Sequence, residues 1–547
     1  MSFNLLHERW LPLVRRSGLR EWASPAALTD GLADDPFVRP DWGRADFDAA
    51  TLEFLIGLLA TAFNPQDDFD WQALWRAPPD STQLAEAFAP LEAAFNLFGD
   101  GPRFMQELGG VTGDASPVSG LFIEAPGGNT VTKNTDLFQK RGQLSALSLP
   151  TAAMALFTLQ AFAPSGGAGH RPSLRGGGPL TTLVLPKEDT LWAKLWLNVP
   201  TGMPPLPEAD GGVSVFPWLG TARSVEKGTP ALGFEDMHPL SAFWWVPRRI
   251  MLDMPTPGEG GVCAITGEAM DVTIASYRTR PWGMSATGPR HPLSPMYRTK
   301  PNDPEWLFVH PQPGGLGYNH WVDIVFAGTP DAMRRPAAIV SEIITARAQA
   351  SGAYRRLWVA GYDMDNMKAR GFVEASFPLF LPENPAAVPA LERHARELVD
   401  GAKEALSALR GAVSKALALA KTDVSRIAAL TRLFYDATET AFFEGVRQLA
   451  EAFSVDTEDD VTGQRVARDF LEKALRPAAL RLFDEAAPLT LLCGREKDMG
   501  RVVEARRHLV STLFGRDRKG LVFAALKLPP PEKSSPKRSP ASLEVMS

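Results

Sequence analysis

Cysteine is nearly absent from this chain, which has only Cys263 and Cys493 among its 547 residues. No Cys-x-x-Cys pair occurs, so a cysteine-rich zinc site is excluded and a disulfide framework is not expected. The N-terminal sequence also lacks the basic, apolar and small-residue order of a signal peptide. We therefore expect a protein of the reducing cytoplasm.

Positive charge is not in excess, because 57 Lys and Arg residues stand against 63 Asp and Glu residues and give a net charge of −6. Nucleic-acid binding would therefore need local basic patches rather than the mean charge of the molecule. Long hydrophobic runs are scarce too. The longest charge-free stretch, residues 143–169, contains Pro150, Gln160 and several hydroxyl side chains, so we predict a buried helix at about 151–162 and no membrane span.

The common motifs of nucleotide binding and hydrolysis are missing. GxGxxG, GxxxxGK[ST], HExxH and GxSxG do not occur, and the eight histidines are scattered singly. The run from Asp363 to Asn366 resembles a metal loop, but it lacks the glycine and the distal glutamate of an EF-hand, which favours a polar hairpin tip. A carbohydrate-active or other hydrolase with paired carboxylates remains an alternative because fourteen tryptophans occur beside many acids, although their apolar context favours a core role.

Tryptophan and proline divide the chain. Every tryptophan lies between Trp10 and Trp358, and after Pro389 the next prolines are Pro477 and Pro488. The pattern predicts an α+β fold, with a large irregular mixed N-terminal domain followed by a C-terminal antiparallel four-helix bundle. The predicted domains are residues 1–384, residues 385–528 and a disordered, proline- and serine-rich tail at 529–547.

Apolar residues that recur every three or four positions predict the four helices of the bundle. They are expected at about 391–417, 427–453 with Asp423 as N-cap, 462–486 with a kink at Pro477, and 499–514. In the first domain we expect helices at about 46–63 and 82–97. Strands are expected at about 4–14, 19–22, 180–185, 243–252, 322–326 and 357–362.

Basic residues gather in three segments. Residues 276–300 contain five bases and no acid, with Tyr277, Trp282 and Tyr297 interleaved, which predicts an exposed loop suited to phosphates and base stacking. Residues 165–178 contain six glycines with Arg171 and Arg175, so the segment is either a close backbone approach to nucleic acid or a flexible linker. Residues 495–519 carry eight bases against four acids, which is also the pattern of an ordinary solvated helix face.

Three sequence stretches, read in their order, resemble the CasA family, the large subunits of the type I-E CRISPR surveillance complex Cascade. They are Phe3–Pro12, Ser173–Gly177 and Gly361–Arg370. The resemblance covers nearly the whole chain. It implies a non-catalytic DNA-binding subunit without cofactor or membrane, which recognises the protospacer-adjacent motif (PAM) in duplex DNA, opens the adjacent base pairs to start the R-loop, and serves as a platform for a helicase-nuclease.

The resemblance also implies the functional residues and partners. The PAM-binding residues would be Gly166, Gly167, Ala168, Gly169, His170, Arg171, Arg278 and Arg280. The duplex wedge would be Asp365, Asn366, Met367 and Lys368, with Asn366 where some relatives carry glutamine. A loop at 122–144, with Phe122, Lys133, Lys140 and Arg141, would contact the 5′ handle of the crRNA. Arg501, Arg506 and Arg507 would face the displaced strand, beside the backbone, handle-binding and small subunits. Some relatives bind zinc near Cys263, but partner cysteines are missing here, so no metal is expected.

Overall fold

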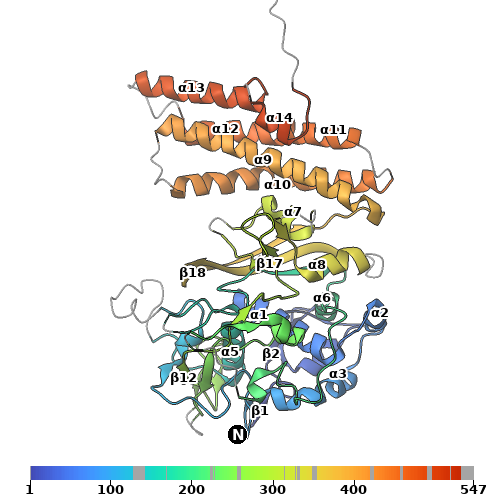
Figure 1. Cartoon of the computed structure of the whole chain (residues 1–547), viewed down its shortest axis with the longest axis vertical. Helices are drawn as coiled ribbons and strands as arrows, with labels where there is room; N and C mark the ends of the chain where they lie inside the picture. The colour runs from blue at the N-terminus through green and yellow to red at the C-terminus, as the bar shows by residue number, and fades with distance from the viewer. Residues whose placement is uncertain are drawn as a thin grey trace, which may run out of the picture. The chain divides into compact units, whose positions relative to one another are not determined.

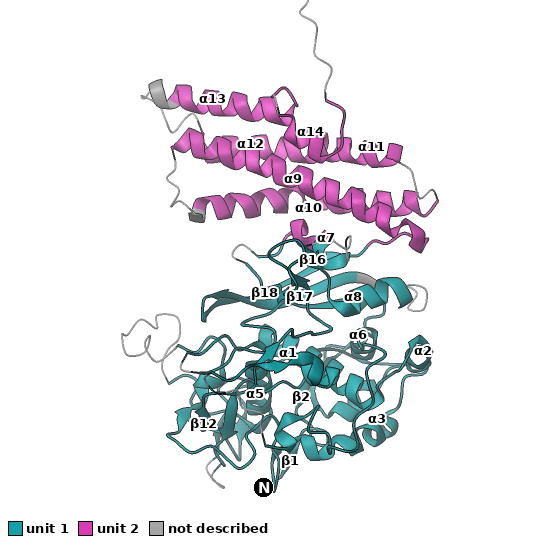
Figure 2. Cartoon of the chain, in the orientation of Figure 1, with its two compact units in different colours: residues 1–316, 323–379 teal, residues 317–322, 380–547 magenta. Residues whose placement is uncertain are grey.

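The chain forms two compact units (Figure 1 and Figure 2). The computed structural model describes residues 2–126, 142–167, 169–221, 226, 228–255, 260–312, 315–326, 328, 333–347, 354–418, 424–455, 460–488, 496–517 and 519–530. Unit 1 comprises Met1–Leu316 and Asp323–Leu379, and unit 2 comprises Gly317–Val322 and Phe380–Ser547. The boundary expected between residues 384 and 385 lies close to this division, whereas the contribution of Gly317–Val322 to unit 2 was not foreseen.

Unit 2 is built from the long amphipathic helices that the sequence pattern predicts. Its helices are α9 (Val388–Leu417), α10 (Val424–Phe453), α11 (Asp460–Phe470), α12 (Arg476–Ala486), α13 (Glu496–Leu513) and α14 (Leu521–Ala525). Helices α11 and α12 together form the third helix of the bundle, and the short connections make successive helices antiparallel. The short α14 was not predicted, the cap at Asp423 lies outside the described residues, and so does most of the predicted tail, residues 531–547.

Residues Gly317–Val322, which unit 2 takes from the middle of the unit 1 sequence, complete the core of the bundle. The Tyr318 ring stacks on Phe442 with 4.3 Å between centroids, and its hydroxyl lies 2.8 Å from that of Thr438. Trp321 packs edge-on against Phe442 and Phe443. Burial raises the pKa of Tyr318 well above its ordinary value. These aromatic contacts bury apolar area that the helices alone would leave to solvent.

The third helix of the bundle is interrupted at the predicted place. A π-helical turn, Leu471–Leu475, joins α11 to α12 just before Pro477. Proline has no N–H and its ring crowds the preceding turn, so the regular ladder of hydrogen bonds cannot run through this position. An inserted π-turn lets the chain continue in the same direction.

Unit 1 mixes helices with small sheets, so the α+β class is confirmed. Its helices are α1 (Ala45–Phe63), α2 (Asp68–Arg76), α3 (Ser81–Phe88), α5 (Leu149–Phe162), α6 (Leu191–Leu197) and α8 (Ala338–Glu342), and α7 (Trp321–Val325) crosses between the units. The paired strands are β1 (Phe3–Asn4) with β5 (Asn96–Phe98), β2 (Leu11–Arg15) with β3 (Arg20–Ala23) and β4 (Phe37–Pro40), β10 (Gly261–Val262) with β11 (Ala269–Met270), and β8 (Leu232–Gly233) with β13 (Ala286–Thr287). The others are β12 (Ser276–Arg280) between β6 (Ser116–Pro117) and β9 (Arg249–Leu252), β14 (Met296–Tyr297) between β15 (Leu307–Phe308) and β16 (Arg334–Arg335), and β17 (Tyr354–Asp365) between β7 (Thr181–Pro186) and β18 (Lys368–Pro378).

Aromatic side chains and two apolar helices form the core of unit 1. Helix α1 packs against α5, and the Phe54 ring meets Trp10, Phe157 and Trp244 at near-perpendicular angles. The predicted buried helix at 151–162 is thus confirmed as α5. Within the described residues, no helix combines the length and apolarity that crossing a bilayer requires. Most tryptophans are buried, as their sequence context predicted. The fully buried ones are Trp10, Trp42, Trp71, Trp196, Trp218 and Trp244 in unit 1 and Trp321 in unit 2.

Several predicted elements in unit 1 were wrong in type or extent. Residues 322–325 belong to the helix α7 rather than to a strand, because periodicity alone cannot separate a short buried helix from a buried strand. Only Arg249–Leu252 of the strand expected at 243–252 is extended, since Pro247 removes a ladder donor before it. The helix expected at 82–97 ends at Phe88, where Pro90 opens a 3-10 turn that leads into β5.

Candidate nucleic-acid interface

The glycine loop closes on itself as a tight turn. The Gly166 N–H donates to the His170 carbonyl at 3.0 Å, and the His170 N–H donates to the Gly167 carbonyl at 2.8 Å. Gly167 and Gly169 have φ of +69° and +87°, in the left-handed region that glycine adopts without steric penalty. Ala168 lies outside the described residues. The described residues of the loop therefore form a turn closed by backbone hydrogen bonds, which favours a shaped backbone surface over a flexible linker.

The described glycines of this loop differ in what lies next to them. A Cβ at Gly166 would lie 2.5 Å from Nη1 of Arg248, and one at Gly169 would lie 2.8 Å from Cε2 of Trp282. Nothing lies within 4 Å of a Cβ at Gly167. Gly166 and Gly169 are thus required by protein packing, whereas Gly167 presents an open backbone face.

Arg248 packs against the glycine loop, and this residue was not identified from the sequence. Its Nη2 donates to the Pro164 carbonyl, and its backbone N–H and C=O pair with the side-chain amide of Gln160 at 3.0 and 2.9 Å. Within the described residues it forms no ion pair with a carboxylate. Burial lowers the pKa of Arg248 to about 10, although Tyr277 partly opposes this shift. Burial, and then the Arg248 charge, also lower the pKa of His170, which keeps this imidazole neutral near pH 7.

The basic segment at 276–300 is less exposed than predicted. Residues 276–280 form β12, Tyr277 is buried, and Arg298 is 9% exposed beside the Trp306 ring. The expectation of a wholly exposed loop is therefore wrong, because the strand pairs with β9 on one side and β6 on the other. Pairing fixes the direction of its side chains, which alternate between the two faces of the sheet.

Arg278 and Arg280 lie on the same face of β12 but have different partners. Arg278 Nε donates to Asp253 at 2.9 Å, and its Nη1 donates to the Gly113 carbonyl. Arg280 Nη2 lies 2.9 Å from Glu107 Oε1 and shares this carboxylate with Arg249. Arg280 is also the more exposed side chain, at 42% against 35%. Arg280 therefore keeps more of its charge and more of its donors available to a ligand.

Trp282 joins this strand to the glycine loop. The backbone N–H of Trp282 donates to the Gly169 carbonyl at 2.9 Å, and the Arg171 guanidinium lies 5.1 Å from the centre of the Trp282 ring. The Trp282 backbone has φ of +68°, and a Cβ at Gly283 would lie only 2.0 Å from the Pro247 carbonyl oxygen. The chain is therefore held firmly here, and two segments far apart in sequence form one basic, aromatic surface.

The remainder of the glycine-rich segment belongs to the core. Arg175 is 3% exposed, lies 2.5 Å from Glu53 and donates to the hydroxyls of Thr181 and Ser294. Burial alone would raise the pKa of Glu53, but the Arg175 charge prevails and lowers it to about 2. Burial, followed by the Arg175 charge, lowers the pKa of His291 to about 4. Arg175 is therefore unavailable to a phosphate.

The predicted wedge is the tip of a long hairpin. Strands β17 and β18 pair up to Asp365 and Lys368, and the side chains of Asp365, Asn366, Met367 and Lys368 are all exposed. Asn366 has φ of +58°, a conformation that Asn adopts more readily than most residues. Within the described residues no group of three His, Cys, Asp or Glu side chains is arranged for a metal. The stretch Asp363–Asn366 leads into the turn of this hairpin.

The root of this hairpin is fixed to the body of unit 1. The Tyr362 hydroxyl donates to Asp46 at 2.5 Å, and burial and the Asp46 charge raise the Tyr362 pKa well above its ordinary value. A Cβ at Gly178 would lie 2.7 Å from the Tyr362 Cβ and 2.9 Å from Met364 Cγ. The glycine-rich segment therefore packs closely on the hairpin, which projects its tip from a rigid base.

The residues predicted to contact the crRNA handle are mostly beyond what the structure describes. Lys133, Lys140 and Arg141 lie in the undescribed stretch 127–141. Phe122 is 3% exposed, stacks on Phe47 and lies under the Arg44 guanidinium. Phe122 is therefore an anchor for the start of the loop and is not itself available to RNA.

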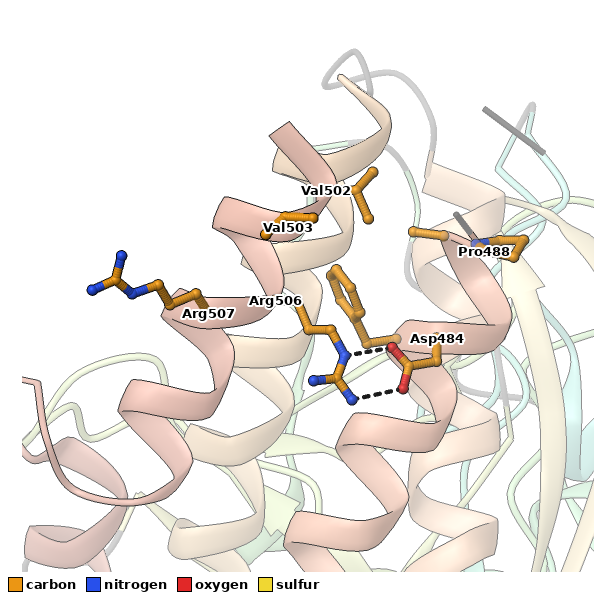
Figure 3. Close-up of a pocket in the computed structure, with 8 residues that line it drawn as sticks. Asp484, Pro488, Val502, Val503, Arg506 and Arg507 are labelled. Carbon is orange, nitrogen blue, oxygen red and sulfur yellow. Dashed lines mark hydrogen bonds and ion pairs between the residues drawn. The ribbon is translucent and has the colours of Figure 1, made fainter. Parts of the chain in front are cut away.

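In unit 2 the three predicted arginines have unequal surroundings. Arg506 makes a two-pronged ion pair with Asp484 across the groove between α12 and α13, at 2.7 and 2.9 Å (Figure 3). Arg501 Nε donates to the Ala416 carbonyl at 3.0 Å. Arg507 is exposed and points away from the groove in Figure 3. Arg507 is therefore better placed than the other two to meet an external phosphate.

Comparison with known proteins shows the family of the chain. A family model described as CRISPR-associated protein Cse1 matches residues 4–482. The structure of CasA (Cse1) from Thermus thermophilus matches with a TM-score of 0.66 at 18% identity, covering 94% of this chain and 99% of that one. Cse1 of Thermobifida fusca matches with a TM-score of 0.67 at 16% identity, covering 96% and 98%. A chain of a CRISPR RNA-guided surveillance complex gives 0.62 at 17% identity, covering 93% and 100%. At these identities the likeness shows a shared fold along nearly the whole chain.

Proposed function

The chain belongs to the CRISPR-associated Cse1 family, and we propose that it is the PAM-recognising subunit of a type I-E Cascade complex. The family match confirms the predicted resemblance to CasA proteins. In this role the subunit binds the PAM in duplex DNA, opens the adjacent base pairs, and offers a platform to a helicase-nuclease while contributing no catalytic residue of its own. The observation that carries the proposal is the open backbone face of Gly167 in a loop that is joined, through the Gly169 carbonyl and the Trp282 N–H, to the segment that carries the partly exposed Arg280.

This surface suits the minor groove of DNA. That groove offers few distinguishing groups, so its recognition depends on close backbone approach, width and a small number of hydrogen bonds. Gly167 has no Cβ to hold a base edge away, and Arg280 supplies charged donors from the strand that leads to Trp282, the residue bonded to the same loop. Arg171 and Arg278 add positive charge for the flanking phosphates.

The hairpin suits the second step, opening of the duplex. Separating a base step costs a few kcal/mol of stacking, and an inserted apolar side chain can offset that loss. Met367 is exposed at the tip and is flanked by Lys368, which can meet a phosphate of a separated strand. The hydrogen bond from Tyr362 to Asp46 fixes the base of the hairpin, so the tip can separate the bases without displacement of the hairpin.

No observation favours the alternative of a hydrolase with paired carboxylates. The tryptophans that suggested a sugar platform are mostly core residues. The buried acids Asp46, Glu53 and Glu107 each form an ion pair with an arginine. The pKa of Glu53 is thereby lowered to about 2, which leaves this carboxylate poorly suited to donate a proton.

Assembly of the complex with and without this chain tests the proposal directly. We expect the chain to confer binding to duplexes that carry a PAM, with affinity that falls steeply as salt rises because phosphate contacts release counterions. Affinities would be measured on duplexes differing only in the PAM, at two salt concentrations. If adding the chain changes neither the affinity nor its dependence on the PAM, the proposed function is wrong.

Substitution of Gly167 by alanine tests which backbone position meets the DNA. We expect Gly167→Ala to weaken binding to PAM duplexes by about threefold to tenfold, because the new methyl group fills the open face. Gly18→Ala is the matched control, since Gly18 also has positive φ and open space but lies in a distant turn. Both changes strain the backbone by about 1–2 kcal/mol, so equal effects of the two variants on DNA binding would contradict a role for Gly167.

A further inference from the structure

The buried carboxylate of Glu107 lies against Arg280 and against Arg249 on the adjacent strand. Arg249 is paired with Arg280 in the register of β9 and β12, so their side chains share one face. Glu107 binds both of them, with Arg249 Nε at 2.9 Å from Oε2 and Arg280 Nη2 at 2.9 Å from Oε1. Two like charges directly opposite each other would repel, and Glu107 offsets that repulsion.

Glu107 is held far more tightly than Arg280. Its side chain is 4% exposed, both of its oxygens are engaged by Arg249, and its N–H donates to the Ile250 carbonyl at 2.8 Å. Arg280 gives only Nη2 to the carboxylate, its Nε is buried without a hydrogen-bond partner within the described residues, and its side chain as a whole is 42% exposed. The carboxylate is thus a fixed point on one side of the guanidinium, while the other side stays available.

We infer that Glu107 is a positioning residue that orients the Arg280 guanidinium toward the PAM. A long flexible side chain loses conformational entropy when it binds, and a fixed partner on one edge removes part of that loss before DNA arrives. The oriented guanidinium can then donate to a base edge at one fixed position, rather than to whichever phosphate lies nearby. This inference deepens the proposed function and rests on it.

Glu107→Gln in the assembled complex tests this role. We expect binding to PAM duplexes to weaken by about threefold to tenfold, which is less than the loss from removing Arg280 itself. Binding to duplexes without a PAM should strengthen by up to about threefold, because a negative charge near the phosphates is lost. The two changes have opposite signs, which general unfolding of the subunit would not produce.

Two further variants separate position from charge. Glu107→Asp keeps the charge but withdraws the carboxylate by one methylene group, so it should also weaken PAM binding. In an Arg280→Ala background, Glu107→Gln should cause no further loss on PAM duplexes, since the residue acts through Arg280. Glu235→Gln is the charge-matched control, because Glu235 pairs with the exposed Arg290 at 3.3 Å, and the ratio of PAM to non-PAM affinity should stay within about twofold.

The inference is wrong if Glu107→Gln tightens PAM binding, leaves it unchanged, or weakens it equally in the Arg280→Ala background. A tightening would mean that Glu107 competes with DNA for Arg280 rather than orienting it. If Arg280→Ala itself leaves PAM discrimination intact, the proposed function fails and not merely the role of Glu107. Binding to a complementary single strand, which needs no PAM, checks that each variant complex is assembled.

Discussion

Replacement of Arg280 by alanine should weaken binding of the assembled complex to PAM duplexes by about 1–3 kcal/mol, or roughly 10-fold to 150-fold. The loss should be smaller on duplexes without a PAM, because there only phosphate contacts are removed. Arg280 and Arg249 share the single carboxylate of Glu107, so the charge of Arg280 is only partly neutralised within the protein. The folded state should tolerate the change, since Glu107 remains paired with Arg249.

Two comparisons make the Arg280 result interpretable. Arg280→Lys keeps the charge but loses the planar fork, so it should restore phosphate binding more than PAM discrimination. Arg290→Ala removes an exposed arginine of the same segment that pairs with Glu235, and it should shift all affinities slightly and equally. Equal losses on PAM and non-PAM duplexes for Arg280→Ala would exclude a role in readout.

Local patterns in the sequence predicted the elements that depend on local physics. The apolar stripe of α9 predicted a helix at 391–417, and the structure has Val388–Leu417. Pro477 predicted an interruption, and the π-turn Leu471–Leu475 lies just before it. Residues 322–326 were mistaken for a strand because their apolar run is too short for periodicity to distinguish the two types of element.

The site could be predicted only in part, because several of its contacts are long-range. The sequence singled out the glycine loop and Arg280, but not Arg248 or Glu107, which lie beside them. Glu107 is 173 residues from Arg280 in the chain, and no spacing rule relates them. Arg248 was not singled out because a strand was expected at 243–252, and nothing in that pattern distinguished Arg248 from the adjacent Arg249.

The largest effect on stability is expected from Arg175→Met. The guanidinium and Glu53 are both almost wholly buried, so removing one partner leaves an uncompensated carboxylate and should lower the free energy of unfolding by about 3–5 kcal/mol. Arg506→Met is the control, because its ion pair with Asp484 is about half exposed and is worth about 0–1 kcal/mol. Denaturant unfolding would be followed by tryptophan fluorescence, which reports mainly on unit 1 because Trp321 is the sole tryptophan of the sequence that falls in unit 2. Far-ultraviolet circular dichroism would be recorded on the same samples, because it also reports on the helices of unit 2, where Arg506 lies.

The pH dependence identifies the ion pair as the cause. The pKa of Glu53 in the folded protein is about 2, below its ordinary 4.5, so the stability it contributes is complete above pH 4.5 and is lost as the pH falls toward 2. The stability difference between the wild type and Arg175→Met should therefore shrink across that interval. Glu53→Gln combined with Arg175→Met should recover much of the loss at neutral pH, because no buried charge remains.

These results would also separate folding from DNA recognition within one segment. Ser173–Gly177, one of the stretches that carries the family resemblance, places Arg175 in the core, whereas Gly169 and Arg171 lie against Trp282, close in sequence to Arg280. Any loss of DNA binding by Arg175→Met should consequently follow the unfolded fraction and affect PAM and non-PAM duplexes alike. If Arg175→Met costs no more stability than Arg506→Met yet abolishes PAM discrimination, Arg175 acts on DNA and the division of the segment into a core part and a binding part is wrong.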